Sequence, residues 1–220
     1  MWGLYRDECA VCYESDHYYS GYEPSMTRVD ILLASDGACR SNGDPRHRTD
    51  RRRGGIGGGI WRTPRYFDDR FKPLIEPISE NLARYDLPRI TNNFAELQAM
   101  LVVLQELDGL IRENGNYHIR KCKNFAFSTD SEYAMNCIFD WVDVWEENAR
   151  NRNDHVWLNS RNRPVKHQRI LEQIINILDR RFNAKTRRSL MIYHCRSHHE
   201  DTCSVNKLVD RLARQGSRNY

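Results

Sequence analysis

Four acidic residues stand where folding could bring their side chains together: Asp36, Glu96, Asp130 and Asp210. Asp36 and Asp130 each follow an apolar run, whereas Glu96 and Asp210 lie in helical patterns. Two negative charges about 4 Å apart repel by roughly 4 kcal/mol at an effective dielectric near 20. A cluster of four carboxylates therefore persists only where cations or protons neutralise it. If the fold gathers these acids, they predict a divalent-cation site, for which Mg²⁺ is the natural occupant.

Hydrophobic periodicity indicates the elements that must position the acids. The apolar run before Asp36 reads as a buried strand that enters a tight turn, and the glycine-rich stretch 54–61 as a second strand. Leucine and isoleucine recur at helical spacing after Glu96, and a short strand ends at Asp130. A last helix over 204–215 carries Asp210, with Ser204 and Gly216 as its caps.

The rest of the chain alternates helices and strands around this frame. A helix is expected from Asp130 to about Asn148, another over 166–182, and a strand over 190–195. Such alternation predicts an α/β layer arrangement. Residues 1–26 show no periodicity and read as an extension of unknown role. Insertions are expected near 44–53, 63–88 and 146–156, the second being a long irregular connection punctuated by proline.

The order of the motifs resembles type 1 ribonuclease H from about Val29 to Gly216. The phrases that carry the resemblance are Asp36-Gly37-Ala38-Cys39, Thr91-Asn92-Asn93-Phe94-Ala95-Glu96, Asp130-Ser131-Glu132-Tyr133 and Asn206-Lys207-Leu208-Val209-Asp210. The resemblance implies a ribonuclease H-like catalytic domain over 27–220. Its fold would be a mixed five-stranded sheet with helices on both faces.

The same resemblance implies a magnesium-dependent endoribonuclease that hydrolyses the RNA strand of RNA–DNA hybrids. Two Mg²⁺ ions, with Mn²⁺ as a substitute, would act together and leave 5′-phosphate and 3′-hydroxyl ends. By similarity, Asp36 would bridge both ions and Asp210 would hold the ion beside the attacking water. Glu96 and Asp130 would hold the ion on the leaving-group side.

The resemblance also implies roles for residues outside the acid quartet. His198 would carry protons or assist product release, with His199 as a competitor, because the family's proline-glycine-histidine pattern and hinge glycines are missing here. Recognition of the RNA 2′-hydroxyl would fall to the asparagines. The residues implied to contact nucleic acid are Asn42, Thr91, Asn92, Asn93, Trp141, Trp157 and Lys166.

Each of these residues also has a purely structural interpretation. Asp36 could make a turn, Glu96 could complete a capping box from Asn93, Asp130 could cap a helix, and Asp210 could be solvated. The asparagines could be turn or cap residues and the tryptophans core residues. Two rival functions follow: a nucleic-acid-binding module of this fold without activity, and a related DNA-strand transferase or resolvase.

Composition sets broader limits. The net charge of +4 and the pI near 8.7 are only mildly basic, but arginines cluster at 46–53 and around Trp157, where a phosphate backbone would fit. Seven cysteines, an odd number, favour reduced thiols and an intracellular location. Cys9 and Cys12 give only a weak zinc signal. With no apolar run long enough to span a bilayer, we expect a soluble monomer without a membrane partner.

Overall fold

The structure, a computed structural model, describes residues 2–5, 29–39, 53–63, 72–85, 90–113, 117–195 and 204–218. Within these residues the chain forms one sheet. Its strands are β1 (Trp2–Tyr5), β2 (Ile31–Cys39), β3 (Gly54–Arg62), β4 (Lys72–Pro73), β5 (Ile78–Asn81), β6 (Asn124–Thr129) and β7 (Ser189–His194). Their order is β1-β7-β6-β2-β3-β4, and β5 also pairs with β3.

The sheet is mixed. Strands β1, β7, β6 and β2 run parallel to one another, whereas β3 is antiparallel to β2, β4 and β5. Parallel neighbours are connected through helices, and buried strands of this kind read as nearly continuous apolar runs. The sequences 31–34 and 124–129 have that character. The mixed sheet therefore confirms the α/β, ribonuclease H-like fold class expected from the sequence.

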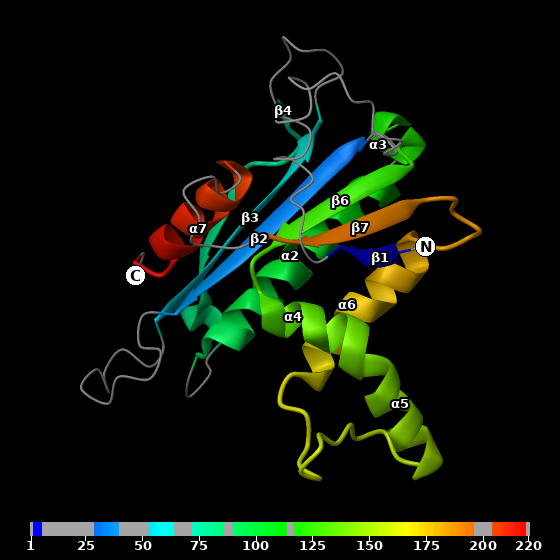
Figure 1. The fold of residues 1–220 in the computed structure, drawn as a ribbon. Coiled ribbons are helices and arrows are strands. Elements are labelled where there is room, and N and C mark those ends of the chain that lie inside the picture. The colour runs from blue at the N-terminus through cyan, green and yellow to red at the C-terminus, as the bar shows by residue number, and fades with distance from the viewer. Residues whose placement is uncertain are drawn as a thin grey trace, which may run out of the picture.

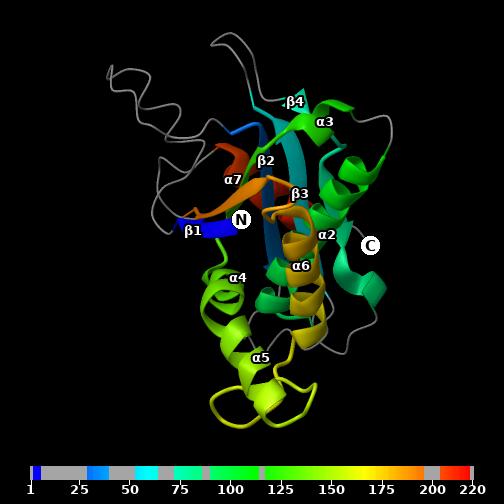
Figure 2. The same cartoon turned by 90° about the vertical axis from the view of Figure 1, so that its right-hand side faces the viewer.

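Helices cover both faces of the sheet, as Figure 2 shows, with α7 on one side and α2 and α6 on the other. Their bounds are α2 (Asn92–Arg112), α3 (Tyr117–Lys121), α4 (Glu132–Asn136), α5 (Val142–Asn151), α6 (Gln168–Arg181) and α7 (Ser204–Gly216), with 3₁₀ helix η2 at Leu82–Tyr85. A π-helical turn, η3 (Cys137–Trp141), joins α4 to α5. The larger hydrophobic core lies between the sheet and α2 and α6, and a smaller one lies under α7.

Helices α2 and α6 are also joined by charge. The buried carboxylate of Asp108 on α2 pairs with Arg181 and, at 2.9 Å, with Arg180, both on α6. Arg112 on α2 adds a third contact at 3.2 Å. Burial raises the pKa of Asp108, but the Arg181 hydrogen bond and the three positive charges together hold it below its usual value. Paired charges are the condition under which a buried carboxylate is tolerated.

The structure corrects several expected boundaries. Strand β2 does not end at Asp36 but continues to Cys39, so Asp36 and Gly37 lie inside the strand and not in a turn. The connection 63–88 is not wholly irregular, because it contains β4, β5 and η2. Gly216 lies within α7 and does not follow it. Part of the N-terminal extension enters the sheet as β1, which pairs with β7.

The helical run after Asp130 extends away from the sheet and forms a handle, which we define as residues 141–169, with α5 as its helix (Figure 1). Its end is fixed by a single bridge between Leu158 and Pro164. Among the helices that the structure describes, none is both long and apolar enough to cross a membrane. Cys39, Cys122, Cys137 and Cys195, the cysteines in the described ranges, are free thiols.

Candidate active site

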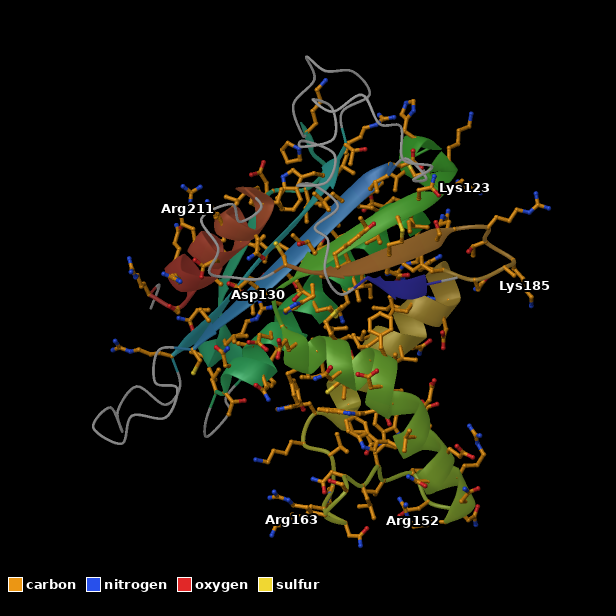
Figure 3. All side chains as sticks on the ribbon, viewed as in Figure 1. Lys123, Asp130, Arg152, Arg163, Lys185 and Arg211 are labelled. Carbon is orange, nitrogen blue, oxygen red and sulfur yellow. The ribbon has the colours of Figure 1, made fainter. Side chains whose placement is uncertain are left out.

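The four predicted acids converge on one cavity of about 510 Å³. Asp36 reaches it from β2, Glu96 from α2, Asp130 from the end of β6 and Asp210 from α7. Figure 3 labels Asp130 where β6 meets α4. Cys39 and Asn92 line the cavity as well, together with residues of α7. Four segments that are distant in sequence therefore bring their carboxylates to a single open site.

Two glycines allow the helices to approach the acid at the centre of the sheet. A Cβ atom on Gly37 would lie 2.2 Å from the backbone carbon of Ala95, so the first turn of α2 rests directly on β2. A Cβ on Gly57, which pairs with Asp36 across the sheet, would lie 2.0 Å from the carbonyl oxygen of Val209. Only glycine permits such close backbone approach. Helices α2 and α7 thereby carry Glu96 and Asp210 to Asp36.

Glu96 lies in the first turns of α2, and side chains hold both of its oxygens. Asn92 Nδ2 donates to Oε1 at 2.5 Å, and the hydroxyl of Ser131 donates to Oε2 at 2.5 Å. The N-cap of α2 is Thr91, whose hydroxyl accepts from the backbone N–H of Phe94 at 3.2 Å. The alternative of a capping box from Asn93 to Glu96 is therefore wrong, and Glu96 is oriented by tertiary contacts instead.

The helix after Asp130 is capped by its neighbour. Ser131 is the N-cap of α4, and its side chain accepts from the backbone N–H of Ala134 at 3.0 Å. The interpretation of Asp130 as a cap is therefore wrong. His194, on the adjacent strand β7, places Nε2 at 3.1 Å from the backbone oxygen of Asp130. This contact joins the ends of β6 and β7, so the two strands end together at the cavity.

Asp210 is partly exposed on α7 and pairs with Arg214 one turn further on. Arg214 Nε donates to Oδ1 of Asp210 at 2.8 Å. The side chain of Arg214 is 63% exposed, so the pair contributes little to the free energy of unfolding. Its effect is on orientation, because it fixes one oxygen of Asp210. The interpretation of Asp210 as a merely solvated acid does not account for its place in the cavity wall.

The electrostatics of the cavity match the repulsion expected of clustered acids. Burial, followed by the negative charges of Asp130 and Asp210, raises the pKa of Asp36 from 3.8 to about 8, although the Gly37 N–H opposes this shift. The pKa of Glu96 is also raised, first by burial and then by the charge of Asp130. Asp36 is 8% exposed, which makes a negative charge there costly. In the protein alone, the raised pKa favours the protonated form of Asp36.

The donor set fits a hard divalent cation, because four carboxylates offer oxygen ligands and an excess of negative charge. As the side chains stand, no three His, Cys, Asp or Glu residues in the described ranges are gathered closely enough to enclose an ion. The contacts of Glu96 with Asn92 and Ser131 explain part of this openness.

Sequence reasoning missed several residues that line the cavity. Three of these, Asn206, Lys207 and Arg214, lie on α7, and two, Ser217 and Arg218, follow directly after it. The positive charges of Lys207, Arg214 and Arg218, and their helical spacing, were visible in the sequence. Asn206 gave no such signal, because its burial depends on where α7 packs. Likewise, nothing in the sequence marked Ser131 as the partner of Glu96.

The predicted nucleic-acid contacts fall into different environments. Asn93 is exposed, whereas Asn92 is half-buried against Glu96 and Thr91 is occupied as a helix cap. Lys166 is exposed at the base of the handle. The exposed cations of the handle are Arg150, Arg152, Arg161, Arg163, Lys166 and Arg169, and Figure 3 labels Arg152 and Arg163 at its far end.

The tryptophans of the handle form a chain of ring contacts that begins near Glu96. Ring centroids lie 6.2 Å apart between Tyr133 and Trp141, 5.7 Å between Trp141 and Trp145, and 6.0 Å between Trp145 and Trp157. Trp141 is 38% exposed, but Trp157 is only 4% exposed. Stacking on a base requires an accessible ring face. The exposed ring of Trp141 meets that requirement, whereas Trp157 supports the handle from inside.

Asn42, His198 and His199 lie outside the described residues, as do Cys9 and Cys12. The arginine cluster at 46–53 is likewise outside them, apart from Arg53.

Comparison with protein families gives one extensive match. The sequence model of the RNase H family matches residues 28–218. Among characterised relatives, a protein named ribonuclease HI from Streptomyces coelicolor is 25% identical over 193 residues. The match covers 86% of this chain and 62% of that relative, so the chain spans about three fifths of the relative's length.

Solved structures show the same fold at low sequence identity. A foamy viral protease-reverse transcriptase, solved in complex with an RNA/DNA hybrid, superposes with a TM-score of 0.56 at 17% identity. The superposition covers 90% of this chain and 22% of the viral one. LC9-RNase H1, described as a type 1 RNase H with the type 2 active-site motif, gives a TM-score of 0.55 at 12% identity. It covers 88% of this chain and 74% of that one.

Proposed function

The chain belongs to the ribonuclease H family, and from this premise we propose that it hydrolyses the RNA strand of RNA–DNA hybrids. The observation that carries the proposal is the convergence of Asp36, Glu96, Asp130 and Asp210 on one cavity. Family membership over most of the chain supports the reaction class. The raised pKa of Asp36 supports a site that needs neutralising positive charge.

We assign two Mg²⁺ ions to this site, with Mn²⁺ as a substitute. When bound, such ions would neutralise the phosphoryl oxygens, activate the attacking water and stabilise the leaving 3′ oxygen. Asp36, at the centre, would contribute to both ions, and Asp210 to the one on the water side. Glu96 and Asp130 would hold the ion on the leaving-group side. The products would carry 5′-phosphate and 3′-hydroxyl ends.

The hydrogen-bond partners of the acids support this assignment of acids to the two ions. Asn92 and Ser131 orient Glu96, and Arg214 orients Asp210, so each acid is presented by a neighbouring donor. Such partners fix the direction of ligand oxygens and tune their basicity. His198, or His199 beside it, would move protons or assist product release from the chain segment between β7 and α7.

The substrate would lie across the cavity and the handle. Asn93, exposed at the start of α2, and Asn42 would contact 2′-hydroxyl groups of the RNA strand. Trp141 and Lys166 would contact the DNA strand through stacking and charge. Asn92 links substrate binding to the metal site, because it lies beside Asn93 and donates to Glu96.

A cleavage assay tests the proposal. We expect a labelled RNA–DNA hybrid to be cut in Mg²⁺ and left intact in EDTA. We expect Asp130→Asn to lower cleavage by at least about 100-fold while hybrid binding survives, because several kcal/mol of charge stabilisation depend on the metal site.

Asp143→Asn is the matched control, because Asp143 is exposed on α5 and does not line the cavity. This variant should cleave at the wild-type rate. Binding without any cleavage by the wild-type protein would refute the enzyme assignment. That result would favour a non-catalytic module of the same fold.

A further inference from the structure

An asparagine that has no role in the proposed reaction lies among the acids. Asn206 lines the same cavity as Asp36 and Asp210. It precedes Asp210 by four residues on α7, a spacing that places two side chains on one face of a helix. Asn206 is only 3% exposed, and its Oδ1 atom has no hydrogen-bond partner among the residues that the structure describes.

Such an oxygen is costly to bury. A buried acceptor without a partner has given up its hydrogen bonds with water and gained none in return. Buried polar atoms of folded proteins almost always have partners, and the exceptions usually mark bound water, an ion or a functional role. The neighbours of Asn206 on the buried side of α7, Val205 and Val209, are apolar. An apolar residue would satisfy packing at this position too, so packing alone does not explain an amide facing the cavity.

We propose that Asn206 Oδ1 is a neutral oxygen ligand of the cation site, beside Asp36 and Asp210. The proposal rests on the proposed function and adds one ligand to it. Carbonyl oxygens of asparagine are ligands for hard divalent cations. A neutral ligand suits this cavity, because it offers an oxygen to a cation without adding to the repulsion among the four acids when no cation is bound.

Helix α7 carries both of these oxygen ligands, from Asn206 and Asp210. Gly57 allows α7 to rest against β3 at Val209, between the two ligands in sequence. Arg214 holds one oxygen of Asp210. Asn206 and Asp210 therefore approach the cavity from one rigid element, whereas the other acids come from β2, α2 and β6.

The test measures Mn²⁺ binding by the full chain without substrate, through the electron paramagnetic resonance signal of free Mn²⁺. Asn206→Leu should weaken Mn²⁺ binding roughly tenfold, as loss of a metal-site partner does. Its free energy of unfolding in EDTA should equal or exceed that of the wild type, because an unpartnered acceptor is removed. Asn206→Asp should tighten Mn²⁺ binding roughly tenfold, because it supplies a charged ligand.

Asn176→Leu is the matched control, since Asn176 is exposed on α6 and does not line the cavity. It should bind Mn²⁺ as the wild type does. A wild-type protein that binds no Mn²⁺ overturns both this inference and the proposed function. Wild-type binding with unchanged affinity in Asn206→Leu overturns this inference alone, as does a loss of affinity matched by a loss of stability in EDTA. If Asn206→Leu does not fold, Asn206→Asp decides: tighter binding supports the ligand role, and equal or weaker binding overturns it.

Discussion

At the scale of single residues, the pKa of Asp36 shows the electrostatic effect of gathering the acids. Its carboxyl is buried among three other acids, so its pKa rises to about 8. The folded protein therefore holds a proton on Asp36 at pH values where the unfolded chain has released it. Such a difference in proton binding makes the free energy of unfolding depend on pH.

We predict that, in EDTA, the free energy of unfolding falls as the pH rises from about 4 to about 8. The sign follows because the folded state binds more protons than the unfolded state over this range. Asp36→Asn should flatten the dependence, although Glu96, whose pKa is also raised, will leave part of it. Denaturant unfolding at several pH values measures the slope.

Two comparisons sharpen this prediction. Asp143→Asn should leave the slope as in the wild type, because Asp143 lies away from the cavity. Saturating Mg²⁺ should reduce the loss at high pH, because a ligand that binds only the folded state stabilises it. If the free energy of unfolding depends on pH equally in Asp36→Asn and in the wild type, the raised pKa of Asp36 is not the cause of that dependence.

The acids could be predicted from sequence because each sits in a motif, but their partners could not. Asp130 was considered as the cap of α4, whereas Ser131 is the N-cap, and its hydroxyl also holds Glu96 across a sequence separation of 35 residues. Asn206 is a neutral residue in a helix, and its burial depends on how α7 packs. Roles of this kind depend on tertiary contacts, which no local pattern encodes.

At the scale of elements, the glycines of β3 decide how closely α7 approaches the sheet. A side chain at Gly57 would meet the backbone of Val209 at 2.0 Å, and backbone cannot rotate away as a flexible side chain can. Any added atom must therefore move α7, and Asp210 moves with it. Overpacking of a close-packed interior typically costs 1–3 kcal/mol, roughly speaking.

We predict that Gly57→Ala lowers the free energy of unfolding by about 1–3 kcal/mol and weakens Mg²⁺ binding. Gly109→Ala is the matched control, because a Cβ on Gly109 would have no atom within 4 Å. Gly109 lies inside α2, so alanine there should stabilise the protein by about 0.5–1 kcal/mol. Denaturant unfolding and Mn²⁺ titration measure both effects. Unchanged metal affinity in a destabilised Gly57→Ala protein would show that α7 is not positioned through this contact.

Elements with a strong apolar pattern were the more predictable ones. Helix α2 and strands β6 and β7 appear close to the expected positions, because their apolar residues repeat over several turns or form continuous runs. Strands β4 and β5 were missed, since they are two and four residues long and lie among prolines. The extension of β2 beyond Asp36 was missed because Asp-Gly reads as a turn signal. There, pairing with β3 outweighs local preference.

At the scale of the whole molecule, the position of the handle relative to the cavity matters for a long ligand. The handle extends from the same end of the sheet at which β6 leads into α4 (Figure 1). Tyr133 begins the chain of aromatic rings, and the charge of Glu96 contributes to the rise in its pKa after burial and Cys137. The handle is therefore packed against the site and not merely appended to it.

We predict different results for two tryptophans of the handle. Trp141→Ala should weaken binding of an RNA–DNA hybrid by about 1–3 kcal/mol, the range for loss of base stacking, with little change in stability. Trp157→Ala should lower the free energy of unfolding by about 3–5 kcal/mol, because Trp157 is buried. Hybrid binding in the Asp130→Asn background, together with denaturant unfolding, separates the two effects. Equal binding by Trp141→Ala and its parent would exclude Trp141 from the interface.

The pairing of β1 with β7 constrains the order in which the molecule can be assembled. Trp2 aligns with Leu190, so the outermost strand pairs with a strand that follows it only far along the chain. During translation, Trp2–Tyr5 leave the ribosome long before their neighbour exists. This edge of the sheet can form only after Ser189–His194 has been synthesised, and contacts of such high sequence separation form slowly. Until then, the newly made segment must stay available without pairing elsewhere.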